Sequence, residues 1–270
     1  MSAAFALIGH PVSHSLSPGM FNAVFAREGI DAHYAAIDIP PGIPLNLRDL
    51  FTDHGLSGAN LTIPHKTAVL NQLDHISDEA ARAGAVNVVI RRGDSLIGYN
   101  TDGRGFLDGL DEKPGHAVML LGAGGAARAI ASAVMSEGVR ELVVLNRSSE
   151  RAEAMLRVLR TSSSAATMKH APLTMEAFAE AAARVTLVAN CTSGGARPVI
   201  DTFLPSALAP GACWVDINYW DPNPPAQAAC RAANVRFQTG HSMLAHQAAH
   251  GFFLFTGRRC DGDDFLSLIT

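Results

Sequence analysis

The chain has 270 residues, of which 48% are hydrophobic and 17% charged, and its formal net charge is −4. This length accommodates two ordinary domains, and the apolar share excludes a chain that is mainly disordered. The slightly acidic balance argues against a protein held on nucleic acid by phosphate contacts, and no stretch reaches the roughly 18 apolar residues of a membrane span. The composition therefore indicates a globular enzyme or small-molecule binder.

The four cysteines, at positions 191, 213, 230 and 260, show no short C-x-x-C spacing. We therefore expect reduced thiols rather than a zinc or redox site. The first residues lack the basic segment and the long apolar stretch of a secretory signal. These features predict a cytoplasmic protein without a metal site.

In the first hundred residues, apolar runs alternate with helix-like segments, which is typical of βα units. We expect a helix over 17–27, with Ser17 as its N-cap, Pro18 in its first turn and Gly29 after its end. Strands are expected at 5–8, 33–37, 58–62, 85–90 and 96–99.

A second series begins after Lys113-Pro114-Gly115. It predicts strands at 117–121, 141–145, 185–189, 213–217 and 235–238, and helices at 126–136, 150–160 and 242–255. The small, polar stretch 161–166 is expected to be a surface loop. The fold class is therefore α/β in two domains, the first with a mixed or parallel sheet and the second Rossmann-like.

The segment that directly follows the strand at 117–121 fits the dinucleotide-binding pattern G-x-G-x-x-G/A. Its residues are Gly122, Ala123, Gly124, Gly125, Ala126 and Ala127. Glycines let the backbone turn tightly and approach a pyrophosphate, which the N-terminus of the following helix attracts. A tight strand-to-helix turn without a ligand would use the same glycines, but the strand–loop–helix context favours a nucleotide.

The residues after the next strand indicate which nucleotide binds. NAD-binding proteins place an acid there for the ribose 2′-hydroxyl, whereas this strand ends in Asn146-Arg147-Ser148, with Arg151 one turn further on. A guanidinium suits a 2′-phosphate, so NADP is favoured and NAD is less favoured. The alternative is that Arg147 is an ordinary solvated loop arginine.

Polar clusters occupy predicted strand ends in the first hundred residues. They are Ser13-His14-Ser15, the segment 60–66 with Asn60, Thr62 and Lys66, Asn87, and Asn100-Thr101-Asp102. Hydroxyls can hold a carboxylate, amides discriminate among ring hydroxyls, and a lysine can exchange a proton. This set suits a polyhydroxylated acid as substrate. The alternatives are a surface lysine at position 66 and a helix N-cap at Asp102.

Several motifs follow one another in a specific order: GHPVSHSLSP at 9–18, NLTIPHK at 60–66, GAVN at 84–87, GYNTD at 98–102, NRS at 146–148, DINY at 216–219 and GHSMLAHQ at 240–247. With these motifs the sequence resembles the shikimate dehydrogenase family along nearly its whole length. The resemblance implies reversible, NADP-dependent reduction of 3-dehydroshikimate to shikimate, a step of aromatic amino acid biosynthesis.

The resemblance also implies residue roles. Lys66 and Asp102 would be the catalytic pair, and Ser13 and Ser15 would bind the substrate carboxylate. The remaining substrate contacts would be Asn60, Thr62, Asn87, Gln247 and Tyr219, with Asp102 among them. The cofactor would contact Gly122, Ala123, Gly124, Gly125, Ala126, Asn146, Arg147, Ser148, Arg151 and Gly240.

Four departures from the family pattern put the substrate in doubt more than the reaction type. Val88 replaces a common threonine, the loop 190–196 lacks a methionine, the segment 221–225 replaces P-x-x-T, and His241 replaces a leucine. The alternatives are therefore a relative acting on quinate, aminoshikimate or another cyclic acid, and a catalytically silent NADP-binding sensor.

The 11 histidines include His246 and His250, whose i, i+4 spacing can bind a metal. We expect instead an ordinary helix face, because no nearby acid completes a ligand set. His14 and His65 flank predicted site residues and are expected to have at most a supporting role.

We expect the substrate domain to comprise residues 1–102 plus 240–270 and the nucleotide domain to comprise residues 103–239, with the site in a cleft that closes on its ligands. The partners would be a small-molecule substrate and no nucleic acid or membrane, in a monomer or homodimer. Because an acidic chain would bind two anions, its positive charge must be concentrated locally, at Lys66, Arg147, Arg151 and the helix after Gly122.

Overall fold

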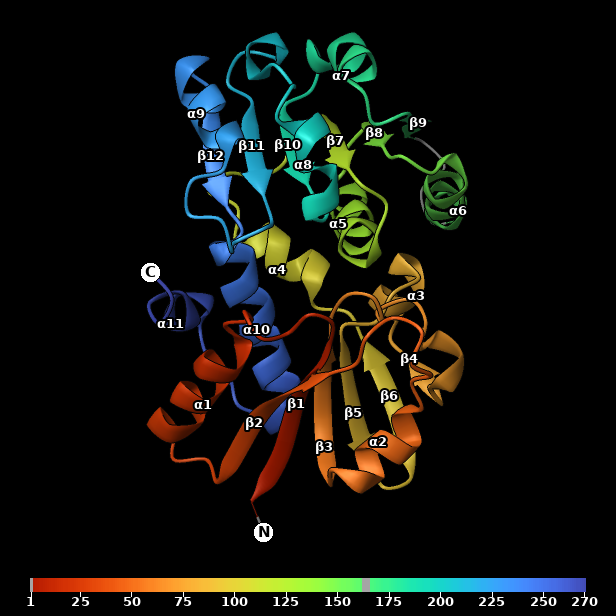
Figure 1. Ribbon diagram of the computed structural model, residues 1–270, viewed down its shortest axis with the longest axis vertical. Helices are drawn as coiled ribbons and strands as arrows, with labels where there is room; N and C mark the ends of the chain where they lie inside the picture. Colours follow the sequence, from red (N-terminus) through yellow and green to blue (C-terminus); the bar gives the residue numbers. More distant parts are fainter. Residues whose placement is uncertain (1, 162–165) are drawn as a thin grey trace.

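The computed structural model describes residues 2–161 and 166–270. Two sheets lie one above the other along the longest axis, and helices cover both (Figure 1). Within the described ranges, no helix combines the length and the hydropathy needed to cross a bilayer.

The first sheet has the strand order β2-β1-β3-β5-β6-β4. Its strands are β1 (Ala3–Gly9), β2 (Ala32–Asp38), β3 (Leu56–Leu61), β4 (His75–Ile76), β5 (Val88–Arg92) and β6 (Ser95–Tyr99). β1 pairs in parallel with β2 and β3, whereas β5 is antiparallel to both β3 and β6. The sheet is therefore mixed. The connections carry α1 (Ser17–Arg27), α2 (Leu47–Asp53), the 3-10 turn η1 (Leu70–Gln72) and α3 (Asp78–Ala83).

The second sheet is parallel throughout, with the order β12-β11-β10-β7-β8-β9. Its strands are β7 (Ala117–Leu121), β8 (Glu141–Leu145), β9 (Thr167–Ala171), β10 (Leu187–Asn190), β11 (Cys213–Asp216) and β12 (Arg236–Thr239). The strand order reverses between β7 and β10, and ligands of such sheets bind at this switch point, outside the carboxyl ends of the strands.

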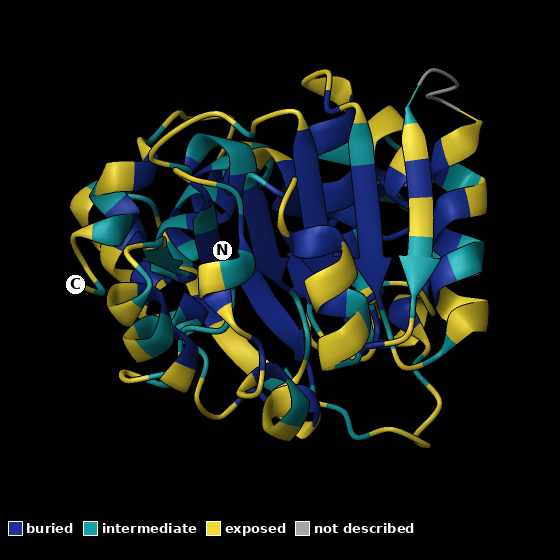
Figure 2. Ribbon diagram, turned by 90° about the horizontal axis from the view of Figure 1, so that it is seen from above, coloured by how far each residue is buried: buried dark blue, intermediate teal, exposed yellow. Residues whose placement is uncertain are grey.

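Helices cover both faces of the second sheet. They are α5 (Gly125–Ser136), α6 (Ser149–Arg160), α7 (Met175–Ala182), α8 (Arg197–Ile200) and α9 (Pro225–Ala232), with 3-10 turns η2 (Gly194–Ala196) and η3 (Pro205–Ala207). Because side chains alternate along a strand, Leu120 of β7 packs towards Ile130 of α5, and Met119 packs towards Phe178 of α7. The central strands are consequently buried along their length, as Figure 2 shows.

Two helices join the domains. α4 (Asp102–Asp108) leads from β6 towards the second sheet, and α10 (His241–Thr256) returns to the first. The contacts are very close: a Cβ at Gly103 would lie 2.5 Å from the Ala129 carbonyl oxygen, and one at Gly105 would lie 2.4 Å from the Gln247 nitrogen. Glycines in α4 therefore let it pack directly on α5 and α10.

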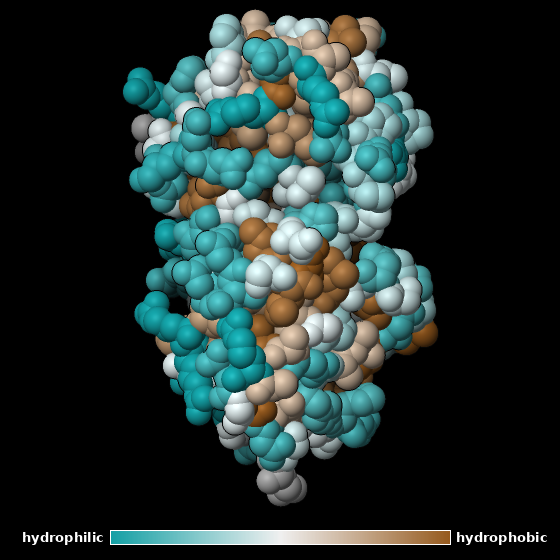
Figure 3. All heavy atoms as spheres, turned by 90° about the vertical axis from the view of Figure 1, so that its left-hand side faces the viewer, coloured by the Kyte–Doolittle hydropathy of each residue, from teal (hydrophilic) through white to brown (hydrophobic). Residues whose placement is uncertain are grey.

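The last residues complete the core of the first domain. α10 and α11 (Gly262–Leu266) lie beside α1, so that helices from opposite ends of the sequence pack together (Figure 1). The ring of Phe252 lies 5.8 Å from that of Phe25, and the ring of Phe265 lies 5.5 Å from that of Phe21. On the side of the molecule where α1 and α11 lie, apolar side chains also reach the surface (Figure 3).

Most predicted elements are confirmed with ends shifted by one to three residues, but three predictions were wrong or incomplete. Leu16, not Ser17, is at the N-cap of α1, and the Ser15 hydroxyl accepts the Ser17 amide at 3.3 Å. Asn87 precedes β5 instead of lying within a strand at 85–90. β9 and several short helices were not predicted. Of the expected loop 161–166, residues 162–165 lie outside the described residues.

Candidate functional site

Lys66 and Asp102 form an ion pair at the junction of the two domains. The Lys66 Nζ donates to Asp102 Oδ2 at 2.6 Å, and the two side chains are 14% and 4% exposed. Lys66 lies in the loop after β3, and Asp102 is the first residue of α4. Asp102 therefore does not cap α4, and its carboxylate faces the lysine. Such a pair can hold a charge and exchange a proton away from bulk water.

Asn87 connects this pair to the rest of the site. Its Nδ2 donates to Asp102 Oδ1 at 2.8 Å and to Thr101 Oγ1 at 2.9 Å, and its Oδ1 accepts the Thr101 amide at 2.8 Å. The Gln247 Oε1 of α10 lies 3.4 Å from the same nitrogen. Both ends of the first domain thus contribute to one buried polar network, which fixes the Asp102 carboxylate.

Asn60, at the end of β3, is held by a partner that the sequence did not reveal. The buried Tyr34 hydroxyl donates to Asn60 Oδ1 at 2.7 Å. Tyr34 is on β2, two strands away, so only the order of the strands could have identified this contact. Thr62 follows β3. A Cβ at position 9 would clash with the Thr62 methyl carbon, so only glycine fits there.

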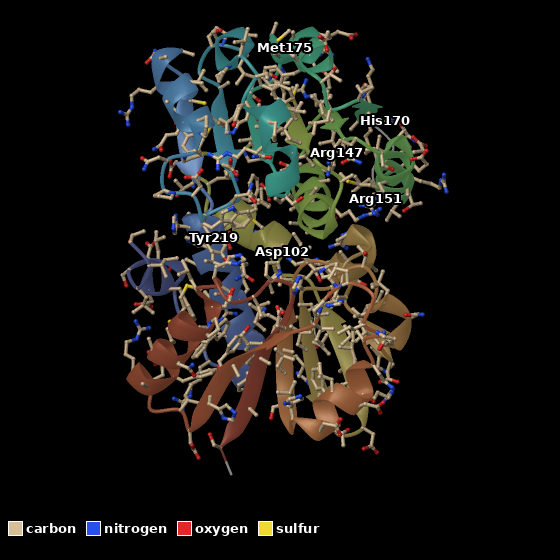
Figure 4. All side chains as sticks on the ribbon, in the orientation of Figure 1. Asp102, Arg147, Arg151, His170, Met175 and Tyr219 are labelled. Carbon is tan, nitrogen blue, oxygen red and sulfur yellow. The ribbon has the colours of Figure 1, made fainter. Side chains whose placement is uncertain are left out.

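The Ser13–Ser15 loop meets the other domain at Tyr219. Burial raises the pKa of Tyr219, and hydrogen bonds with the Ser15 hydroxyl and the Leu16 amide oppose that rise. Ser13 is exposed and Ser15 is partly exposed. Figure 4 shows Tyr219 and Asp102 beside the junction between the upper and lower domains. Tyr219, Ser15 and Asp102 therefore lie at the junction of the two domains.

The glycine-rich loop lies against Lys66. Gly122 adopts φ +104°, which favours glycine, and Gly124 is at the N-cap of α5 with no side-chain cap. A Cβ at Gly125 would lie 2.8 Å from the Lys66 Cβ, whereas one at Gly124 would meet nothing within 4 Å. The open helix N-terminus can therefore receive a pyrophosphate beside Lys66.

The N-terminus of α6 presents two cations. Arg147 and Arg151 are exposed, and neither forms an ion pair with a residue that the structure describes. Ser148 caps α6 by accepting the Arg151 amide at 3.2 Å, and its hydroxyl donates to Glu150 at 2.8 Å. Asn146, at the end of β8, donates to the Ser148 carbonyl oxygen at 2.8 Å. The arginines fit a 2′-phosphate, and Figure 4 shows them on the α6 side of the upper domain.

A buried network that the sequence analysis did not identify joins the ends of β10 and β11. Asn190 Nδ2 donates to Asp216 Oδ2 at 3.0 Å, and the Asn218 Nδ2 donates to Asp216 Oδ1 at 2.7 Å. Burial raises the pKa of Asp216, and these amide donors oppose the rise. Asn190 also accepts the Thr192 hydroxyl at 2.7 Å. A Cβ at Gly240 would lie 2.2 Å from the Ile217 carbonyl oxygen, so this segment also packs tightly against the start of α10.

The histidines have structural partners. His250 lies 2.7 Å from Asp108, an acid that the sequence analysis did not expect there, and His246 bonds to the Ser242 carbonyl oxygen at 2.9 Å. His65 bonds to the Ile39 carbonyl oxygen at 3.0 Å. In the part of the chain that the structure describes, no group of three or more potential ligands gathers for a metal.

Of the departures from the family pattern, Val88 and Ala196 are buried in the two cores. His241 differs, because its ring lies 6.0 Å from that of Tyr219. One departure is therefore in contact with a predicted substrate residue.

Two family models match the chain: the shikimate dehydrogenase substrate-binding domain over residues 7–89 and the shikimate/quinate 5-dehydrogenase domain over residues 109–204. A shikimate dehydrogenase (NADP(+)) from Moorella thermoacetica is 40% identical over 261 residues, which cover 94% of this chain and 88% of the relative.

Solved structures resemble the chain over nearly its full length. A shikimate 5-dehydrogenase from Thermus thermophilus in complex with NADP(H) and shikimate has a TM-score of 0.81 and 33% identity, with 98% of each chain covered. A quinate dehydrogenase from Corynebacterium glutamicum in complex with NAD has a TM-score of 0.84 and 29% identity, with 99% of this chain and 98% of that chain covered.

Proposed function

Because the chain belongs to the shikimate dehydrogenase family, we propose that it catalyses the reversible, NADP-dependent reduction of 3-dehydroshikimate to shikimate. The observation that carries this proposal is the buried Lys66–Asp102 pair, 2.6 Å apart, next to Gly125 of the dinucleotide loop. A group that can exchange a proton thus lies beside the loop for the hydride-carrying cofactor, as a carbonyl reduction requires.

The residues of the chain handle the proton and the orientation of the substrate. NADPH, when bound, supplies the hydride for the carbonyl carbon. Lys66 donates a proton from its Nζ to the carbonyl oxygen as that oxygen becomes a hydroxyl, and it regains a proton from water. Asp102 stabilises the ammonium form of Lys66. Once the oxygen is a hydroxyl, the Asp102 carboxylate can accept a hydrogen bond from it and orient it. In the oxidation direction, Lys66 accepts the proton from the hydroxyl.

We assign the substrate contacts as follows. Ser13, Ser15 and Tyr219 hold the carboxylate, and the ring hydroxyls contact Asn60, Thr62, Asn87 and Gln247. The proximity of Asn87 to both Asp102 and Gln247 supports this assignment, because one ring could reach all three. An amide network of this kind rejects analogues that lack a hydroxyl, since the buried amides would then lose a partner.

NADP fits the second domain. The open N-terminus of α5 would receive the pyrophosphate, and Arg147 and Arg151 would receive the 2′-phosphate. No carboxylate follows β8 directly to select a free 2′-hydroxyl, because Asn146 stands there.

A second candidate is oxidation of quinate. The structural likeness to a quinate dehydrogenase and the altered surroundings of Tyr219 favour it. Steady-state rates with shikimate, quinate and aminoshikimate, each with NADP and with NAD at 340 nm, would separate the candidates. We expect the highest kcat/KM for shikimate with NADP, and a kcat about 10²- to 10⁴-fold lower for the Lys66→Ala variant. Tight NADPH binding without oxidation of any of these acids would instead indicate a sensor.

We further propose that residues 1–102 plus 240–270 form the substrate domain and that residues 103–239 form the nucleotide domain, working as a monomer or homodimer. We place the enzyme in the cytoplasm, because all four cysteines are free. Limited proteolysis should cut near these boundaries, and sedimentation should give the number of copies.

A further inference from the structure

Two loops from different domains meet at the domain junction. The His14 ring lies 5.7 Å from the Trp220 ring in an edge-on arrangement at 73°. Ser15 and Tyr219 are the chain neighbours of this pair, and the Ser15 hydroxyl helps to oppose the rise in the pKa of Tyr219. His14 belongs to the loop between β1 and α1, and Trp220 belongs to the loop after β11. The His14–Trp220 pair is the only aromatic contact between these two loops among the described residues.

The surroundings of Trp220 differ from those of the other tryptophan. Trp214 is fully buried, whereas Trp220 is 47% exposed. Trp220 is thus not a core residue, and its ring is available for a contact with the other domain. Tyr219 lies between Trp220, at 5.7 Å, and His241, at 6.0 Å, so a short aromatic row leads from α10 to His14.

The His14–Trp220 contact affects the predicted carboxylate site because His14 lies between its two serines. Ser13 and Ser15 are its immediate neighbours, so whatever fixes the His14 ring also fixes the backbone that carries both hydroxyls. Tyr219 is likewise the immediate neighbour of Trp220. The groups that would hold the carboxylate come from both domains and are aligned only while these loops are in contact.

We propose that Trp220 and His14 are positioning residues that hold the two halves of the carboxylate site together and thereby set the affinity for cyclic acids. This inference rests on the proposed function, because Ser13, Ser15 and Tyr219 contact the acid only if that function holds. It adds Trp220 and His14, which touch the reacting atoms nowhere, as determinants of substrate binding.

The test compares Trp220→Ala, His14→Ala and His14→Phe, with Leu204→Ala as the control, because Leu204 is 58% exposed in the same domain as Trp220. We expect Trp220→Ala and His14→Ala to raise KM for shikimate about two- to tenfold, the scale of one aromatic pair. KM for NADP, kcat and the melting temperature should change little, and His14→Phe should restore most of the shikimate affinity. A purely structural role would lower stability and affect both ligands together.

An unchanged KM for shikimate in Trp220→Ala, with an active wild-type enzyme, would overturn the proposal. If the wild type oxidised none of the acids, the proposed function would fail instead, and the contact would be tested separately. Acrylamide quenching of the ligand-free protein, with Trp220→Phe as the Trp214-only baseline, should then show greater access to Trp220 in His14→Ala. No change in quenching would show that the two rings do not protect each other and would also overturn the proposal.

Discussion

Lys66 and Arg147 are both cations of the proposed active site, yet their surroundings are opposite. The Lys66 side chain is 14% exposed and already paired with Asp102. Arg147 and its neighbour Arg151 are exposed at the N-terminus of α6 and form no ion pair within the described ranges. The Lys66–Asp102 pair, the catalytic end of the proposed site, is thus already neutralised within the protein. Arg147 and Arg151, the phosphate end, are available to pair with the negative charge of a ligand. Preorganisation serves the proton transfer, and free cations serve binding.

The largest effect is expected at the catalytic end. Lys66→Ala should lower kcat about 10²- to 10⁴-fold, the usual contribution of acid–base catalysis. It should also destabilise the fold, because the Asp102 carboxylate, 4% exposed, would lose its partner.

Lys66→Arg separates these two effects. The guanidinium keeps the charge but does not release its proton near neutral pH, so we expect near-normal melting with a kcat as low as that of Lys66→Ala. If Lys66→Arg kept more than about a tenth of the activity, proton exchange by residue 66 would be ruled out.

The second effect is expected at the phosphate end. Arg147→Ala should weaken NADP binding by roughly 1.5–3 kcal/mol, as for a charged hydrogen bond, and should leave NAD binding unchanged. Arg157→Ala is the matched control, because Arg157 is exposed in the last turn of the same helix. Titration of each variant with both cofactors checks this, and equal losses for NADP and NAD would contradict the assignment.

The third prediction concerns the place where the two ends meet. A methyl group at Gly125 would press on the Lys66 stem at 2.8 Å, so Gly125→Ala should lower kcat about tenfold, within the scale of overpacking. A methyl group at Gly124 would meet no protein atom within 4 Å, so Gly124→Ala should affect cofactor affinity and not kcat. Stopped-flow measurement at saturating NADPH distinguishes the two variants. A normal kcat in Gly125→Ala would show that Lys66 moves away freely.

The smallest effect is expected away from both the catalytic end and the phosphate end of the site, at the Asp108–His250 contact between α4 and α10. Burial raises the pKa of Asp108, but hydrogen bonds from His250 and Arg104 lower it by more, so the net pKa lies below its ordinary value. The folded state then binds this proton more weakly than the unfolded chain. The resulting stabilisation is present above the unfolded pKa of about 4 and is lost as the pH falls through the folded value.

Asp108→Asn should therefore lower the free energy of unfolding by up to about 1 kcal/mol at neutral pH, as expected for a partly exposed pair. The difference from the wild type should vanish in acid. Unfolding curves between about pH 3 and 7 test this, and a difference that persisted at the acid end would exclude the ion pair as its cause.

The sequence predicted the parts of the site that depend on short motifs. The Gly122–Gly125 loop follows a spaced glycine motif, and the resemblance of the sequence to a family implied the roles of Lys66 and Asp102. The support around them depends on tertiary structure: Tyr34 on β2 reaches Asn60 on β3 across β1, and Asp216 bonds to Asn190. No spacing in the sequence indicates those contacts.

The same distinction holds for the fold. Buried strands such as β7 are continuous apolar runs and were predicted to within a residue. β9 lies at a sheet edge with alternating exposure and two basic residues, Lys169 and His170, so its pattern is weak. α2 and α3 are only seven and six residues long, and helices this short carry little periodicity.

The packing of the last helices on the first has a consequence for synthesis. Phe21 and Phe25 emerge early from the ribosome, but their partners Phe265 and Phe252 follow the whole second sheet in the sequence. That parallel sheet is continuous in sequence and can fold while translation proceeds. The first domain keeps an open apolar face until α10 and α11 have been made. A chain that stopped before α10 would therefore carry a folded nucleotide-binding unit attached to an incomplete, aggregation-prone segment.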